Sequence, residues 1–185
     1  MKRILFTVML FCSIAVNTAS GQQHYKGVAG VSLSANGLIA NGLSYGAEAM
    51  YSRYLTRSIT LQGGFYWDLS HFKLNDDSYP IHNIGVRADL FYTLLSVRSF
   101  YLNGGAGVGV GLEETSQSRS IMEQRKITID GFQNKFSLSL EPKINAEYFF
   151  TSRWALLMEV KGMYRPLSNT TKFIPAFGVG VKTLF

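Results

Sequence analysis

The sequence predicts an all-β fold, an eight-stranded antiparallel up-and-down barrel of the type that crosses an outer membrane. Three observations predict this fold. Apolar residues alternate with polar or small ones in eight segments, an even number of strands. The connections between these segments are alternately short and long, as in outer-membrane barrels. The final segment alternates up to the last residue, with Phe177, Val179, Val181 and Phe185 on one face.

Residues 1–21 are predicted to be a cleaved signal peptide. Met1, Lys2 and Arg3 make a basic start, an apolar run covers 4–16, and small residues end at Gly21. The apolar run is shorter than the roughly 20 residues that a permanent membrane helix needs. Residues 22–185 are therefore assigned to one barrel domain.

The composition limits the possible functions. The single cysteine, Cys12, lies in the signal peptide after bulky Phe11, which argues against lipid attachment and leaves the mature chain without disulfides or thiolate metal sites. The net charge is +6, or about +4 (6 minus 2) without Lys2 and Arg3. The basic residues are scattered singly, so direct nucleic-acid binding is not expected.

The first four predicted strands each have one apolar and one polar face. They run from about 25 to 36, 43 to 54, 59 to 69 and 84 to 92. Their outward faces are Ala29, Val31, Leu33 and Ala35; Leu43, Tyr45, Ala47, Ala49 and Tyr51; Ile59, Leu61, Phe65, Trp67 and Leu69; and Ile84, Val86, Ala88, Leu90 and Tyr92.

The second four strands repeat this design from about 100 to 112, 136 to 150, 154 to 165 and 176 to 185. Their outward faces are Phe100, Leu102, Ala106, Val108, Val110 and Leu112; Phe136, Leu138, Leu140, Ile144, Ala146, Tyr148 and Phe150; Trp154, Leu156, Met158, Val160 and Tyr164; and the terminal face from Phe177 to Phe185.

Short connections are expected at 55–57, 95–98 and 151–152, and longer ones near 37–42, 71–79, 113–133 and 166–172. This alternation places both termini on the periplasmic side. Aromatic residues favour membrane interfaces, so those near the short turns are expected to form a periplasmic girdle. They are Tyr51, Tyr54, Tyr92, Phe100, Tyr148, Phe150, Trp154 and Phe185, with Trp67, Tyr79 and Tyr164 at the opposite rim. Core aromatics of a soluble sandwich are the alternative interpretation.

The polar faces put charged residues inside the barrel, where eight strands leave room just for side chains. The expected interior network comprises Glu48, Asp68, Asp89, Glu141, Glu147 and Glu159 with Arg87, Lys143, Lys161, Arg165 and Lys182. Six acids against five bases favour paired ions and a filled interior over a selective pore. The glycine run 104–111 has a period of two, unlike a dinucleotide fingerprint, so no cofactor is expected. These glycines make room for large neighbours such as Tyr66, Phe91 or Phe149.

A catalytic or metal site is weakly indicated. His71, Asp76, Asp77 and His82 flank the second long connection, and a Ser-His-acid site or a metal site could be drawn from them. Nothing in their spacing singles one out, so no catalytic or metal residue is assigned, and a lipid-modifying hydrolase ranks third among the functions. The connection 113–133 mixes basic and apolar residues, as partner-binding loops do.

The assembled pattern resembles the conjugal transfer protein TraO family of Bacteroides-type conjugative elements. The resemblance rests on Lys26-Gly27 and, in the last third, on Glu141, Glu147-Tyr148-Phe149, Thr151-Ser152-Arg153 and the stretch Gly178–Lys182. It implies a small outer-membrane barrel, in a Gram-negative bacterium of Bacteroides type, that is an accessory part of a mating apparatus without catalysis of its own.

The expected partners are outer-membrane lipid, the barrel assembly machinery, for which Phe185 would be the signal, and other conjugative-transfer proteins. The alternative is a free-standing outer-membrane protein that acts in adhesion or envelope protection through its extracellular loops.

Overall fold

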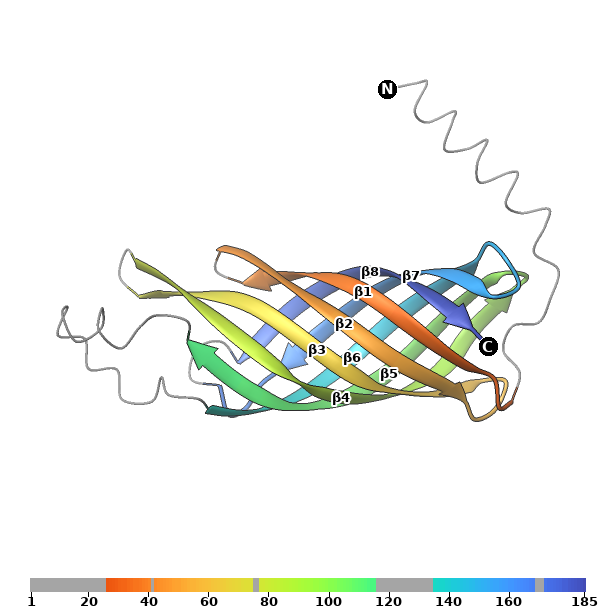
Figure 1. Cartoon of the computed structure of the whole chain (residues 1–185), viewed down its shortest axis with the longest axis horizontal. Coiled ribbons are helices and arrows are strands. Elements are labelled where there is room, and N and C mark those ends of the chain that lie inside the picture. The colour runs from red at the N-terminus through yellow and green to blue at the C-terminus, as the bar shows by residue number, and fades with distance from the viewer. Residues whose placement is uncertain (1–25, 41, 75–76, 116–134, 169–171) are drawn as a thin grey trace, which may run out of the picture.

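A closed antiparallel barrel of eight strands makes up the described part of the chain (Figure 1). The computed structural model describes residues 26–40, 42–74, 77–115, 135–168 and 172–185. Each strand pairs with its neighbour in sequence, and the last pairs with the first. The predicted fold class is therefore confirmed. The strands are β1 (Ala29–Ala40), β2 (Gly42–Tyr54), β3 (Ile59–Leu74), β4 (Asp77–Val97), β5 (Phe100–Thr115), β6 (Lys135–Phe149), β7 (Trp154–Tyr164) and β8 (Phe173–Leu184).

Strand β8 closes the barrel against β1, as its alternation predicted. The register runs from Gly30 opposite Leu184 to Leu38 opposite Ala176. Closure removes both sheet edges, so every strand has a neighbour on each side for its backbone hydrogen bonds.

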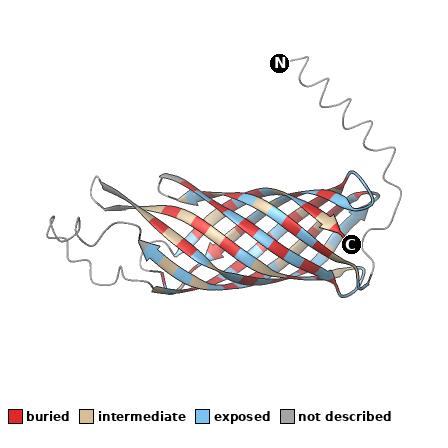
Figure 2. Cartoon of the chain, in the orientation of Figure 1, coloured by how far each residue is buried: buried red, intermediate tan, exposed pale blue. Residues whose placement is uncertain are grey.

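The alternation of the sequence becomes an inner and an outer face (Figure 2). On β8, Phe177, Val179 and Val181 are exposed on the outside, whereas Ala176 and Lys182 are buried inside. The same parity holds on the other strands up to the register shift of β4 between Thr93 and Leu95, where Leu94 and Leu95 are both exposed. The outer surface carries a wide belt of exposed apolar side chains, and the buried set is largely polar.

Two of the expected long connections are strand instead. β1 continues to Ala40 and β2 begins at Gly42, and β3 continues to Leu74 before β4 begins at Asp77. The 37–42 and 71–79 assignments were therefore wrong. The physical reason is that backbone pairing continues to Ala40 opposite Gly42 and to Leu74 opposite Asp77. Residues 37–40 are all apolar or glycine, so their sequence does not mark two different faces.

Short turns join β2 to β3, β4 to β5 and β6 to β7. The bounds 95–98 were wrong for the second of them, because β4 continues as paired strand to Val97 beyond a register shift between Thr93 and Leu95. β7 ends at Tyr164 and β8 begins at Phe173, on either side of the connection expected at 166–172. β5 extends to Thr115, and the rest of the 113–133 connection lies outside the described residues, as does the predicted signal peptide. Within the described ranges, no helix has the length and apolarity to cross a membrane.

Candidate functional site

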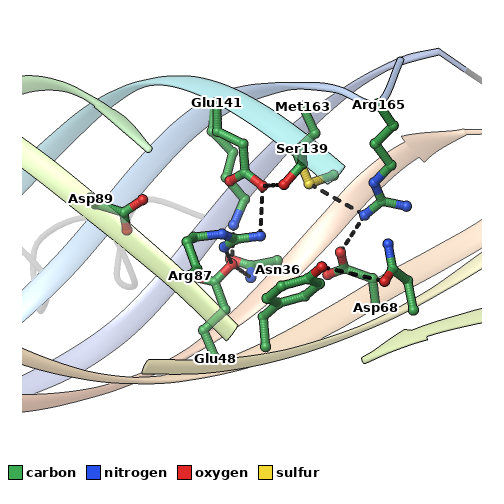
Figure 3. A network of polar contacts seen from close by, with 12 residues as sticks. Asn36, Glu48, Asp68, Arg87, Asp89, Ser139, Glu141, Met163 and Arg165 are labelled. Atoms are coloured by element: carbon green, nitrogen blue, oxygen red, sulfur yellow. Dashed lines mark hydrogen bonds and ion pairs between the residues drawn. The ribbon is translucent and has the colours of Figure 1, made fainter. Parts of the chain in front are cut away.

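Arg87 is the centre of a buried ion network inside the barrel (Figure 3). It projects from β4 between two carboxylates on strands that are not its neighbours. Its Nη1 donates to Glu48 of β2, and its Nη2 lies 2.8 Å from Glu141 Oε1 of β6. The guanidinium suits this position because its donors can serve two carboxylates at once.

Two lysines extend the network on either side of Arg87. Lys143 Nζ lies 2.8 Å from Asp89 and 3.4 Å from Glu141. Lys161 pairs with Glu48 and lies 3.4 Å from Glu159. The result is one chain of ion pairs from β2, β4, β6 and β7, with four carboxylates and three bases. This network ties together opposite walls of the barrel.

Two smaller ion pairs complete the interior. Arg165, just after β7, donates to Asp68 of β3 at 2.5 Å. Lys182 of β8 lies 2.9 Å from Glu147 Oε1 of β6. The eleven charged residues expected inside the barrel thus all occur in these contacts, and all are buried apart from half-buried Glu159.

Tyr54 also lies inside, which corrects its assignment to the periplasmic girdle. Its side chain is 1% exposed, its hydroxyl donates to Glu147 Oε2 at 3.2 Å, and Lys182 donates to the same hydroxyl at 2.8 Å. The parity of β2 explains this, because Tyr54 shares its face with buried Ser52 and not with outward Tyr51.

Neutral polar side chains that sequence reasoning missed complete the network. Asn36 Nδ2 donates to Glu48 at 2.8 Å, and the Ser139 hydroxyl donates to Glu141 at 2.7 Å. The Arg87 guanidinium lies over the Tyr66 ring, with Cζ 4.5 Å from the ring centre. The Tyr66 hydroxyl donates to Asn83 Oδ1. Their parity along the strands could have shown that these side chains point inward. Which residue each of them contacts depends on the register between strands.

Glycines of β5 make the room that these large residues occupy, as expected for Tyr66 and Phe91. A Cβ on Gly111 would lie 2.6 Å from the Tyr66 hydroxyl, and one on Gly105 would lie 2.6 Å from the Phe91 ring. Side chains at these positions would collide with the interior.

Apolar clusters lie on both sides of the ions. At the short-turn end, Tyr54, Tyr101, Phe149, Ala155 and Leu184 pack together. At the other end the cluster is Leu38, Met163, Ile174 and Ala176. Between them an interior cavity, lined among others by Ser32, Glu48 and Gln62, has about 20 Å³ of space, enough for about one water molecule. The described interior thus contains apolar clusters at its two ends and paired ions between them.

The outer wall carries the remaining predicted aromatics near the short turns. Tyr51, Tyr92, Phe100, Phe150, Trp154 and Phe185 are exposed there, and Tyr148 is half-buried. Towards the other rim, Tyr45, Trp67 and His82 form an outer cluster, in which Trp67 Nε1 donates to His82 Nδ1 at 3.3 Å. Tyr164 is exposed, and the Tyr79 side chain lies outside the described part.

Of the four residues considered for a metal or catalytic site, the structure describes the side chains of His71 and His82, and the side chain of Asp77 lies outside the described part. His82 bonds and stacks with Trp67, His71 is half-buried farther along β3, and Asp76 lies outside the described residues. No group of three or more His, Cys, Asp or Glu side chains in the described ranges is placed to hold a metal ion.

Comparison with known proteins shows the fold. No protein-family model and no curated protein sequence matches the chain. Solved structures of small outer-membrane barrels do match. Neisserial surface protein A has a TM-score of 0.57 and 11% identity, over 85% of this chain and 96% of that one.

Two further structures match equally widely. The N-terminal barrel domain of Pseudomonas aeruginosa OprF has a TM-score of 0.53 and 12% identity, over 86% of this chain and 98% of that one. The attachment invasion locus protein Ail of Yersinia pestis, in complex with the heparin analogue sucrose octasulfate, has a TM-score of 0.53 and 14% identity, over 86% and 99%. The chain has the fold of these small outer-membrane barrels.

Proposed function

We propose that this chain is a non-conducting barrel of the Gram-negative outer membrane that acts through its surfaces and not through a pore or catalysis. One observation carries the proposal: an exposed apolar belt surrounds an interior that is filled by paired ions and capped by apolar clusters. The belt suits lipid. A cavity of about 20 Å³ suits no solute larger than water.

The specific role that we propose is that of an accessory component of a conjugative DNA-transfer apparatus in a Bacteroides-type bacterium. The support is the resemblance of the last third of the chain to the TraO family. DNA would pass through a larger assembly, because the filled interior leaves no room for it. The barrel would contribute its wall and its loops to the other transfer proteins.

Gene deletion tests this role directly. We expect loss of the gene to lower mating frequency, and a copy supplied in trans to restore it. Unchanged transfer after deletion, with the other transfer proteins present, contradicts the conjugation role but leaves the barrel proposal intact.

A free-standing surface role is the second candidate. It is favoured by the β3–β4 hairpin, which continues past the apolar belt as paired strand up to Leu74 and Asp77. A barrel with the same fold, Ail, is described as an attachment protein. Normal mating together with weaker cell attachment after deletion would favour this candidate.

Insertion follows the same proposal. The short turns and both termini would lie in the periplasm, and Phe185, exposed beside β1, would be read by the barrel assembly machinery. Replacing Phe185 with Ser should lower the amount of folded barrel in the outer membrane, whereas Phe177→Ser, on the same outer face of β8 but away from the end, serves as the control.

A further inference from the structure

The short-turn end of the barrel carries a basic collar, defined here as Lys26, Arg53, Arg57, Arg98 and Arg153. All five side chains are exposed. In the described part of the chain, the carboxylate residues outside the filled interior are Asp77, Glu113 and Glu114. All three lie on strand segments at the opposite end. The charged side chains of the collar therefore all carry one sign of charge.

The topology spreads the collar around the whole rim. Each of the three short turns contains one arginine: Arg57, Arg98 or Arg153. In a closed eight-stranded barrel these three turns lie in different quarters of the rim. The fourth quarter, where β8 meets β1, has Lys26, which is held there by the hydrogen bond from Gly27 N to Tyr54 O at 2.8 Å. Figure 1 shows the turns and the C-terminus at this one end.

The turns are built so that the arginines are left free to face outward. Thr56 Oγ1 accepts the backbone N–H groups of Ser58 and Ile59, and Thr151 Oγ1 accepts those of Arg153 and Trp154. The threonine hydroxyls thus satisfy these turn donors. The guanidinium groups, which carry donors only, take no part in these contacts.

Arg98 occupies a strained position. Its φ is 53°, in the left-handed region, and it is the one non-glycine residue with positive φ in the described ranges. Glycine or asparagine would fit there at lower cost, since an ordinary side chain loses about 1 kcal/mol or more. The turn thus has a cation where its backbone geometry favours another residue.

Arg53 indicates which partner the collar meets. It lies on the outer wall of β2, in the same row as Tyr51 and Leu55 and opposite Leu61 of β3. These neighbours are exposed apolar or aromatic side chains of the belt. A cation set into such a wall extends its charged group to the membrane interface, where lipid phosphates lie. A soluble polymer would reach the turns but not this wall.

We propose that the basic collar binds the phosphate groups of anionic phospholipids in the leaflet at the short-turn end, and thereby sets the depth and tilt of the barrel. This rests on the proposed membrane location. Each basic residue near an anionic lipid surface contributes about 1 kcal/mol, so the preference for an anionic lipid at the collar is expected to be several-fold.

The two tryptophans give a test with an internal control. Trp154 lies at the collar and Trp67 in the other half of the barrel. The probe is brominated phosphatidylglycerol, compared with brominated phosphatidylcholine at the same fraction in phosphatidylcholine vesicles. In the Trp67→Phe variant, phosphatidylglycerol should quench Trp154 roughly threefold or more strongly. In the Trp154→Phe variant, Trp67 should show no such preference.

Substitutions assign the effect to the collar. The ratio of Trp154 quenching by phosphatidylglycerol to that by phosphatidylcholine should fall to about 1 when four substitutions are combined. They are Arg53→Gln, Arg57→Gln, Arg98→Gly and Arg153→Gln. Lys172→Gln, at the opposite end, should leave the ratio unchanged. Arg98→Gly alone should lower the ratio while leaving the barrel equally or more stable in uncharged detergent, which a structural role of Arg98 would not produce.

The possible results separate the two proposals. Failure of the chain to fold in phosphatidylcholine vesicles, seen as a lack of heat-modifiable gel migration, contradicts the membrane proposal itself. Folding with equal quenching by both lipids overturns the collar proposal alone. A preference that survives the four substitutions, or binding of the folded barrel to peptidoglycan in place of any lipid preference, overturns it as well.

Discussion

At the scale of single residues, Arg87 holds the interior together because it faces two carboxylates at once. Arg87→Met would leave Glu48 and Glu141 buried with one cation fewer. Removing one member of a buried ion pair typically costs 3 to 5 kcal/mol, and we expect a loss of about that size in the free energy of unfolding. Urea unfolding in uncharged detergent measures it.

Two further variants separate charge from packing. Arg57→Met removes an exposed arginine and should change stability by less than about 0.5 kcal/mol. Adding Glu141→Gln to Arg87→Met should recover part of the loss, because one uncompensated carboxylate disappears. If Arg87→Met unfolds at the same urea concentration as Arg57→Met, the network does not support the fold.

Neighbouring glycines of β3 give a second test at this scale. A Cβ on Gly64 would meet the backbone oxygen of Ala49 and lie 2.8 Å from Met50 Cα, whereas the nearest atom to a Cβ on Gly63 is 3.6 Å away. Gly64→Ala should therefore cost roughly 1 to 3 kcal/mol, because backbone must move. Gly63→Ala should be neutral or slightly stabilising. Equal melting temperatures for the two variants would contradict this.

At the scale of the strands, alternation alone predicted which side chains face outward, because period two leaves just two faces. Tyr54 was misplaced although its parity with Ser52 was visible, since aromatic character was given more weight than phase. The extensions of β1 to Ala40 and β3 to Leu74 could not be predicted from alternation. The backbone pairing continues there, but apolar and polar residues no longer alternate: 37–40 are all apolar or glycine, and Ser70 and His71 are adjacent polar residues.

Paired ions were predicted, but the partners within each pair were not, for a related reason. Parity showed that Arg87, Glu48 and Glu141 share the interior, but which of them meet depends on the register of several strands and on the barrel's tilt. The glycines of β5 were different, because their period of two in the sequence directly indicated space for large neighbours.

The apolar belt makes a prediction at the strand scale that depends on depth. Val108 lies in the middle of β5, and Val97 ends β4 beside the short turn; both are exposed on the outside. Val108→Arg should cost roughly 2 to 4 kcal/mol in a bilayer, and Val97→Arg about 0 to 1, because the penalty for a charge falls towards the interface.

Unfolding of both variants in phosphatidylcholine vesicles measures the difference. The same pair in aqueous solution with short-chain detergent is the control, since a thin micelle reduces the penalty at Val108. A similar cost at both positions would mean that the belt is not centred on the middle of β5.

For the whole molecule, the filled interior predicts that the folded barrel does not admit sugars. Ions and apolar clusters occupy the space between the walls, and the cavity lined by Ser32, Glu48 and Gln62, at about 20 Å³, holds about one water molecule. A path would require several paired charges to leave their partners together, at a cost of several kcal/mol for each uncompensated buried charge. Vesicles that contain the barrel should therefore swell in arabinose no faster than empty vesicles, whereas a porin should speed swelling. Heat-modifiable migration in the same sample shows that the barrel is folded, and swelling that rises with the amount of folded barrel would contradict a closed interior.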